Sequence, residues 1–180
     1  MIKLPPYLKK GDKIAVVCPA KKLPSAIDEA VKKLQEWGLE VVIGETVTAS
    51  HHQFAGSDIL RAKDLQKYMD DTSVKAIIAG RGGYGTIRII DEIDYAAFNR
   101  SPKWFVGFSD ITILLNHTLA VHDTASIHGQ MPMTFEDASP ASLESLHSAL
   151  FGEIFHVPAA ANALYRIGEA SGILTGGNLT

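Results

Sequence analysis

The sequence holds very little cysteine, because Cys18 is the only one among its 180 residues. A lone thiol excludes an intramolecular disulfide framework and any metal site built from several cysteines. Cys18 ends the apolar run from Ile14, so we expect a buried and unreactive thiol. No histidine pair stands at a convincing metal-ligand spacing with carboxylates, so we expect no metal site.

Excess charge and long apolar runs are also missing. The formal net charge is −3 and the lysine pairs are scattered, which argues against nucleic acid as the main partner. No stretch approaches the roughly 18 apolar residues of a membrane span, and the amino terminus lacks the apolar core of a signal peptide. The sequence therefore predicts a cytoplasmic protein that is not embedded in a membrane.

Strand and helix patterns alternate along the first part of the chain. Apolar runs and helical spacing predict strands at 13–18, 39–43, 74–79, 104–107 and 125–128, and helices at 24–37, 57–70, 84–92, 110–120 and 139–151. Strands that are apolar throughout, joined by helices, indicate an α/β fold with a parallel sheet covered on both faces. Ligands in such sheets bind at the carboxyl ends of the strands.

The end of the chain has a different character. Residues 159–163 are small, as in a linker, and residues 166–180 begin a new strand-and-glycine pattern that stops at once. We therefore predict an α/β domain over residues 1–150, and a linker with the start of an interrupted second domain over residues 151–180.

Ser109 stands between an apolar strand and the start of a helix, in Gly107-Phe108-Ser109-Asp110. Hydrolytic α/β folds present a nucleophilic serine on such a turn, where the N–H of the next residue, here Asp110, faces the same spot. The motif match is partial, because the second glycine of G-x-S-x-G is missing. Ser-Asp before an apolar helix is also a common N-cap. Spacing alone leaves both interpretations open.

A second turn, Arg81-Gly82-Gly83-Tyr84-Gly85, follows the strand at 74–79. Its glycines allow positive φ and close approach by a substrate, and its bare N–H groups could face a developing oxyanion. It could also hold a phosphate, or be a turn without a ligand, although it fits neither common nucleotide motif. Arg81 could pair with a substrate carboxylate; for Arg88 a structural salt bridge is the better interpretation.

A serine nucleophile needs a base, usually histidine. The chain has seven histidines. His117 follows Ser109 in the helix and is expected to point away from it. His128 could lie at the same carboxyl-end edge of the sheet as Ser109, where it would be a structural or a substrate-lining residue. The residues thus supply a nucleophile and an oxyanion turn, but no secure base.

Four motifs follow one another along the chain: Gly11-Asp12-Lys13-Ile14-Ala15-Val16-Val17 with Pro19-Ala20, Arg81-Gly82-Gly83-Tyr84-Gly85, Gly107-Phe108-Ser109-Asp110-Ile111-Thr112 and His128-Gly129. Together they resemble the LD-carboxypeptidase family of serine peptidases, which includes muramoyl-tetrapeptide carboxypeptidases and microcin C immunity peptidases. Near the end, Gly168-x-Ala170-x-Gly172 and Gly176-Gly177-Asn178-Leu179 resemble the start of that family's second domain.

The resemblance implies a flavodoxin-like domain, a Ser-Glu-His triad with Ser109 as nucleophile, and an oxyanion hole from the N–H groups of Gly83 and Asp110. It implies removal of the terminal D-alanine from a peptidoglycan tetrapeptide during cytoplasmic cell-wall recycling, by a homodimer without a metal or organic cofactor. The substrate would be a muropeptide or another L,D-peptide. We expect Arg81, Gly82, Tyr84 and His128 to line its site.

The sequence departs from the family in length and in one motif. Family chains continue through a second domain that supplies the glutamate and histidine of the triad, and neither position is present here. Gln130 also replaces the proline more usual after His128-Gly129. We therefore expect the chain to be inactive alone, since a serine without a base is a poor nucleophile. The alternatives are a microcin C immunity-type amide hydrolase, or a non-catalytic module that binds a peptide or an anion.

Overall fold

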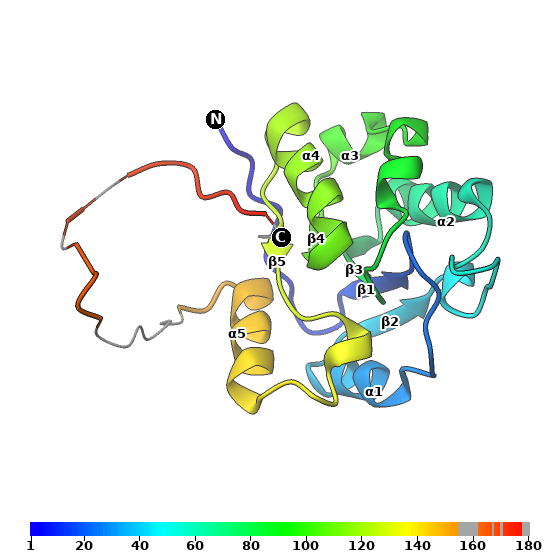
Figure 1. Ribbon diagram of the computed structural model, residues 1–180, viewed down its shortest axis with the longest axis horizontal. Helices are drawn as coiled ribbons and strands as arrows, with labels where there is room; N and C mark the ends of the chain where they lie inside the picture. The colour runs from blue at the N-terminus through cyan, green and yellow to red at the C-terminus, as the bar shows by residue number, and fades with distance from the viewer. Residues whose placement is uncertain (155–161, 167, 170, 178–180) are drawn as a thin grey trace.

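The computed structural model describes residues 1–154, 162–166, 168–169 and 171–177 (Figure 1). Its centre is a five-stranded sheet in the order β2-β1-β3-β4-β5, and every neighbouring pair is parallel. The strands are β1 (Lys13–Val17), β2 (Glu40–Ile43), β3 (Val74–Ala79), β4 (Trp104–Gly107) and β5 (Ile127–His128). The parallel α/β sheet expected from the apolar strands is confirmed, in the strand order of flavodoxin-like folds.

Helices connect the strands and cover the sheet. The α-helices are α1 (Asp28–Glu36), α2 (Asp58–Asp70), α3 (Ala96–Arg100), α4 (Thr112–His122) and α5 (Pro140–Phe151). Short 3-10 helices lie between them: η1 (Glu45–Val47), η2 (Thr86–Arg88), η3 (Ile90–Glu92), η4 (Ser109–Ile111) and η5 (Pro132–Thr134). None of the helices among these described residues is long and apolar enough to cross a bilayer.

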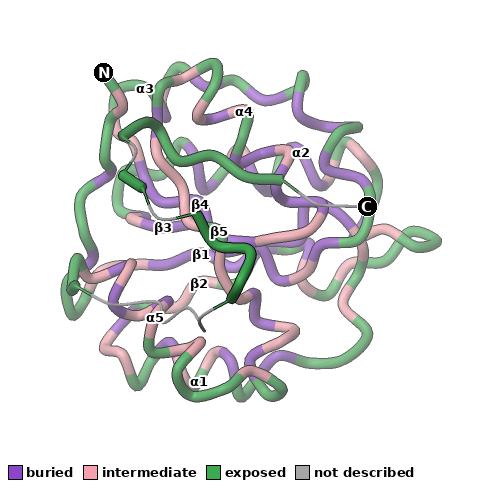
Figure 2. The backbone as a smooth tube through the Cα atoms, turned by 60° about the vertical axis from the view of Figure 1, so that its left-hand side comes forward, coloured by how far each residue is buried: buried purple, intermediate pink, exposed green. Residues whose placement is uncertain are grey.

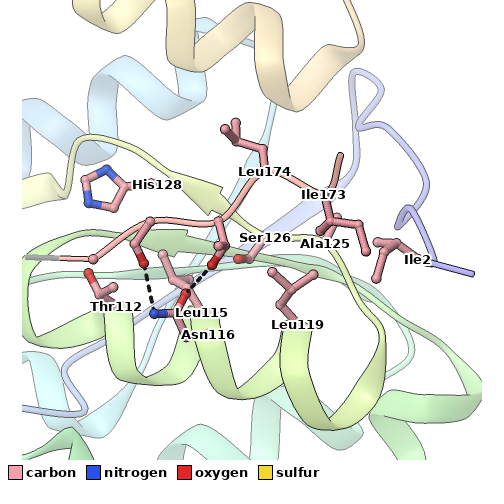
Figure 3. Close-up of a pocket in the computed structure, with 13 residues that line it drawn as sticks. Ile2, Thr112, Leu115, Asn116, Leu119, Ala125, Ser126, His128, Ile173 and Leu174 are labelled. Atoms are coloured by element: carbon pink, nitrogen blue, oxygen red, sulfur yellow. Dashed lines mark hydrogen bonds between the residues drawn. The ribbon is translucent and has the colours of Figure 1, made fainter. Parts of the chain in front are cut away.

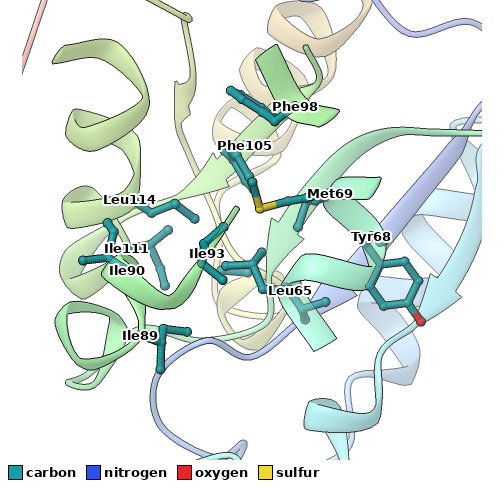
Figure 4. Packing of buried hydrophobic residues seen from close by; sticks show 14 of the residues in the cluster. Leu65, Tyr68, Met69, Ile89, Ile90, Ile93, Phe98, Phe105, Ile111 and Leu114 are labelled. Atoms are coloured by element: carbon teal, nitrogen blue, oxygen red, sulfur yellow. The ribbon is translucent and has the colours of Figure 1, made fainter. Parts of the chain in front are cut away.

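Successive strand residues feed two separate cores. Ile77 and Phe105 pack with α2, α3 and α4 on one face, where Figure 4 shows Met69 lying between these elements. Ile78 and Val106 face the opposite side and pack with α1 and α5. The central strands β1, β3 and β4 are almost wholly buried, whereas the edge strands β2 and β5 are partly exposed. Figure 2 shows the end of the chain exposed. Burial on both faces explains why the strands are apolar throughout rather than alternating.

Local signals set two of the helix ends. The Ser57 hydroxyl accepts a hydrogen bond from the Leu60 N–H at 3.2 Å and caps α2. Gly38 takes a positive φ of 87° directly after the C-cap Trp37 and ends α1.

The prediction of a helix over residues 84–92 is wrong. Gly85 has a φ of 138°, which excludes it from a helix, and Ile89, with φ −119°, separates the residues that follow into η2 and η3. The short α3 was not predicted at all.

Two other elements are shorter than expected. The helix predicted from residue 24 begins at Asp28, where Asp28 and Glu29 provide the acidic first turn that helices favour.

The strand predicted over residues 125–128 is reduced to Ile127–His128. The amino-terminal segment takes up the remaining main-chain bonds, because the Ala125 N–H donates to the Lys3 carbonyl at 2.9 Å. After Phe151 the described residues form no further helix or strand. Residues 159–161 of the predicted linker, and positions 167, 170 and 178–180 of the final motifs, lie outside the described residues.

Candidate active site

Ser109 lies directly beyond the carboxyl end of β4, in the first position of η4. Its φ is +60°, a left-handed conformation that a residue with a Cβ adopts only under constraint. The side chain is half-buried rather than enclosed. The alternative N-cap role is not what the structure contains, since neither η4 nor α4 has a side-chain cap hydrogen bond. Ser109 therefore stands on a sharp strand-to-helix turn with its hydroxyl not used for capping.

The turn after β3, which we call the glycine corner (residues 81–85), lies beside it. Its backbone takes positive φ at Gly83 (113°) and Gly85 (138°), conformations that glycine adopts without strain. A Cβ built on Gly82 would lie 3.2 Å from the Ser109 Cβ and 3.4 Å from the Asp110 nitrogen. The strand order explains this contact, because β3 and β4 are neighbours and both turns leave their carboxyl ends.

Main-chain donors are available where the two turns meet. Among the hydrogen bonds of the described residues, none uses the N–H of Gly83 or of Asp110. Gly83 is exposed, so its N–H can reach a ligand. A serine hydroxyl and main-chain N–H groups on two neighbouring turns are the kinds of group required to attack a carbonyl and to stabilise the resulting oxyanion.

The carboxylate of Asp110 binds the glycine corner from the serine side. Its Oδ2 accepts a hydrogen bond from the Thr86 N–H at 2.9 Å, and the residue is buried. The sequence suggested a role only for the Asp110 main chain. This side-chain contact could not be found from the motif, because it joins residues 24 positions apart.

Arg61 of α2 is a second residue that the sequence did not reveal. It is fully buried, and its Nη1 donates to the carbonyls of Pro19 and Gly85, the latter at 2.9 Å. Its Nη2 donates to Asp58. An arginine three residues after an aspartate looks like an ordinary exposed helix pair, so its sequence context gave no signal of burial.

The other residues expected at the substrate site occupy varied positions. Arg81 is half-buried and donates to the Lys22 carbonyl at 2.6 Å. Tyr84 is exposed, on the same corner. His128 is exposed at the end of β5, its ring centroid 6.2 Å from that of Phe108.

Arg88 points away from the serine turn and forms an ion pair with Asp58, at 2.6 Å between Nη2 and Oδ2. The expected structural salt bridge is therefore present. The hydrogen bond from Arg88 lowers the pKa of Asp58, and Arg61 adds to that effect.

The structure does not identify a base for the serine among the described residues. Within the described residues, the Ser109 hydroxyl forms no hydrogen bond with a histidine. His117 packs instead against Tyr95, with ring centroids 5.0 Å apart. The same residues contain no cluster of three or more histidine, cysteine, aspartate or glutamate side chains that could hold a metal ion.

Cys18 is buried, as predicted, at the end of β1. Burial is the main cause that raises the pKa of its thiol to about 12. A Cβ on Gly80 would lie 2.7 Å from its sulfur, so the thiol is packed against the start of the glycine corner. Cys18 is a packing residue rather than a nucleophile.

Two cavities adjoin the site without enclosing Ser109. One of about 680 Å³ lies between α4, β5 and residues 173–177, with Thr112 and His128 at one end. In Figure 3, Asn116 of α4 contacts this last segment; its Nδ2 donates to the Gly176 carbonyl at 2.9 Å. The other, of about 420 Å³, is lined by Phe108, His128 and α5. Both lie beyond β4, on the side of β5, so a substrate could extend there from the serine turn.

Known proteins match the chain in sequence. Residues 14–129 match the family model described as LD-carboxypeptidase N-terminal domain. The chain is 37% identical over 186 residues to a probable murein peptide carboxypeptidase of Bacillus subtilis (strain 168), covering 98% of this chain and 57% of that protein. It is 29% identical over 181 residues to the murein tetrapeptide carboxypeptidase of Pseudomonas aeruginosa, covering 93% and 58%.

Solved structures match the fold. An MccF-like protein from Bacillus anthracis str. Ames superposes with a TM-score of 0.73 at 30% identity, over 82% of this chain and 47% of that chain. A muramoyltetrapeptide carboxypeptidase from Oxalobacter formigenes gives 0.66 at 30% identity, over 76% and 47%. The chain therefore spans about half the length of the relatives that it matches.

Proposed function

The chain belongs to the LD-carboxypeptidase family, and from that membership we propose that it is the nucleophile-bearing part of a serine carboxypeptidase. Residues 1–150 would form the α/β domain, and residues 151–180 the linker and the start of a second domain. The observation that carries the proposal is the contact between the left-handed Ser109 turn and the glycine corner. This contact supports a site in which the Ser109 hydroxyl acts together with the N–H groups of Gly83 and Asp110.

In the proposed reaction, the Ser109 Oγ attacks the scissile carbonyl carbon while a base takes the hydroxyl proton. The carbonyl oxygen becomes an oxyanion, which the N–H groups of Gly83 and Asp110 stabilise. Collapse of the tetrahedral intermediate breaks the C–N bond, and the base returns the proton to the departing amine. Water then hydrolyses the acyl-enzyme by the same steps and frees the serine.

The proposed substrate of this reaction is a peptidoglycan tetrapeptide whose terminal D-alanine is removed. Its support is the naming of similar proteins as murein peptide and murein tetrapeptide carboxypeptidases. Arg81, Gly82, Tyr84 and His128 would line the substrate. Tyr84 and His128 are exposed, and the half-buried Arg81 could offer part of its guanidinium to a carboxylate. A cytoplasmic, homodimeric enzyme of cell-wall recycling is part of the same proposal.

The chain by itself is proposed to be inactive. A base from the second domain is needed, and loss of a triad member reduces the rate by several orders of magnitude. The Ser109 hydroxyl has no histidine bonded to it in the described residues, which supports this view.

A chimera tests the proposal. The chain would be fused to the carboxyl-terminal part of the Bacillus subtilis relative that it does not cover, and D-alanine release from a muramoyl tetrapeptide would be measured. We expect release by the chimera, none by the chimera with Ser109→Ala, and almost none by the chain alone. Ser101→Ala is the matched control, because Ser101 lies before β4 and away from the corner. A folded chimera without activity, or brisk hydrolysis by the chain alone, contradicts the proposal.

The likeness to the MccF-like structure, at 30% identity, favours one second candidate. This is an immunity-type hydrolase that cuts an amide between an acidic residue and a nucleotide analogue. The same chimera distinguishes the two, because a preference for an aspartyl sulfamoyl nucleoside over the tetrapeptide would select the second candidate.

A further inference from the structure

The peptide unit between Gly85 and Thr86 is bound on both sides by groups of opposite charge. Its carbonyl oxygen accepts from Arg61 Nη1 at 2.9 Å, and its N–H donates to Asp110 Oδ2 at 2.9 Å. Arg61 is fully buried and Asp110 is 9% exposed. Hydrogen bonds to charged groups are the stronger ones, and burial increases what is lost when one of them breaks.

Both bonds favour the same orientation of this peptide. The cation meets the negative end of the peptide dipole and the carboxylate meets the positive end. A flipped peptide would direct its carbonyl at the carboxylate and its N–H at the guanidinium. Gly85, with φ 138° and ψ −16°, has no Cβ to oppose such a flip. The corner therefore needs an outside restraint, and the charged pair provides it.

The position of this peptide also determines how the two turns meet. Asp110 is the residue after the candidate nucleophile, and its carboxylate binds the far end of the glycine corner. At the near end, Gly82 touches the backbone of the serine turn, where a Cβ would lie 3.2 Å from the Phe108 oxygen. The corner is thus held against the serine turn at both ends, with Gly83 between them.

We propose that the side chains of Arg61 and Asp110 are positioning residues that clamp the Gly85–Thr86 peptide and thereby orient the N–H groups of the oxyanion site. The inference rests on the proposed function for its catalytic consequence, but the clamp is a property of the isolated chain. Neither side chain takes part in bond breaking. Their effect would be on the rate of the chemical step rather than on substrate binding.

Asp64 provides a matched control. It is also a buried aspartate, 5% exposed, and it also accepts main-chain N–H groups, from Thr46 at 2.9 Å and from Glu45 at 3.2 Å. Its partners belong to η1 and not to the glycine corner. Substitution of Asp64 therefore reproduces the loss of a buried carboxylate without releasing the clamped peptide.

The first measurement uses the 180-residue chain and amide hydrogen exchange read by NMR. In Asp110→Ala we expect the Thr86 amide to exchange at least about tenfold faster, as for loss of a hydrogen bond to a charged group. The Gly83 resonance should shift as well. Asp110→Asn retains an acceptor oxygen and should show smaller changes, and Asp64→Asn should leave residues 82–86 unchanged. Unchanged Thr86 and Gly83 amides in a folded Asp110→Ala protein would overturn the inference.

The second measurement places the same substitutions in the chimera. For Asp110→Ala we expect kcat to fall about 10- to 100-fold, as for an oxyanion donor displaced by a fraction of an ångström to an ångström, with KM nearly constant. Asp110→Asn should recover part of kcat, and Asp64→Asn should change neither constant per folded molecule. A normal kcat in Asp110→Ala refutes the positioning role. If the folded parent chimera releases no D-alanine, the proposed function fails, and the amide measurements alone decide whether the clamp exists.

Discussion

Ser109 allows a direct test of backbone strain at the candidate nucleophile. Its φ of +60° places an L-residue in the left-handed region, which costs about 1–2 kcal/mol relative to the right-handed helix region. Ser109→Gly and Ser109→Ala both remove the hydroxyl, but only the glycine variant relieves this strain. The comparison between the two variants therefore isolates the backbone conformation from the loss of the side-chain oxygen.

The expected difference follows from two opposing terms. Relief of strain favours glycine by about 1–2 kcal/mol, whereas the greater freedom of glycine in the unfolded chain disfavours it by about 0.5–1 kcal/mol. We expect Ser109→Gly to be more stable than Ser109→Ala by about 0.5–1 kcal/mol. For a domain of this size that corresponds to a Tm difference of about 1–4 °C.

Urea unfolding of the Ser109→Gly and Ser109→Ala variants would measure the difference between their free energies of unfolding, provided that the two variants have the same m-value. Asp123, with φ 52° at the C-cap of α4, is the positive control, and its glycine variant should also exceed its alanine variant. Ser101, with φ −138°, is the negative control, and there alanine should be the more stable. If the Asp123 pair responds but Ser109→Gly is no more stable than Ser109→Ala, the strained turn at Ser109 is refuted.

Three further changes have measurable consequences. Gly82→Ala places a methyl group 3.2 Å from the Ser109 Cβ and should destabilise the fold by about 1–3 kcal/mol; an unshifted urea midpoint would contradict the close contact. Because burial raises the Cys18 pKa to about 12, only about one thiol in ten thousand is ionised at pH 8, so iodoacetamide should label the unfolded chain and spare the folded one; rapid labelling of native protein would disprove the buried thiol. The hydrogen bond from Arg88 holds the Asp58 pKa below its ordinary value of 3.8, so the stability it contributes is present above that pH and is lost as the pH falls further. Asp58→Asn should therefore weaken the dependence of stability on pH below about pH 4, and an unaltered acid limb would argue against the ion pair.

The sheet could be predicted from the sequence because its central strands are mostly apolar. The bounds of β3 and β4 agree with the apolar runs at 74–79 and 104–107. Both faces of these strands are buried, so Lys75, which is only half-buried, is the one charged residue in the two runs. Their adjacency then follows from the strand order, and with it the contact between the serine turn and the glycine corner.

The details of the site could not be predicted, because they depend on contacts between distant residues. The helical spacing of residues 84–92 was misleading, since positive φ at Gly85 prevents a helix there. Arg61 and Asp64 lie in a helix whose polar residues look solvated in sequence, yet both are buried by loops that arrive from other parts of the chain. The charge of a residue does not reveal whether it is buried. The buried charge of Arg61 is compensated by the main-chain carbonyls of Pro19 and Gly85, and that of Asp64 by the Thr46 N–H.

The buried guanidinium of Arg61 has a consequence for the order in which the molecule folds. It joins carbonyls that are 42 residues before it and 24 residues after it along the chain. Closing loops of that length costs chain entropy, and non-local contacts of this kind are acquired more slowly than local ones. The peptide groups that Arg61 binds should thus order together with the pairing of β1 and β3, which joins residues even farther apart in the chain, and not with the local formation of α2.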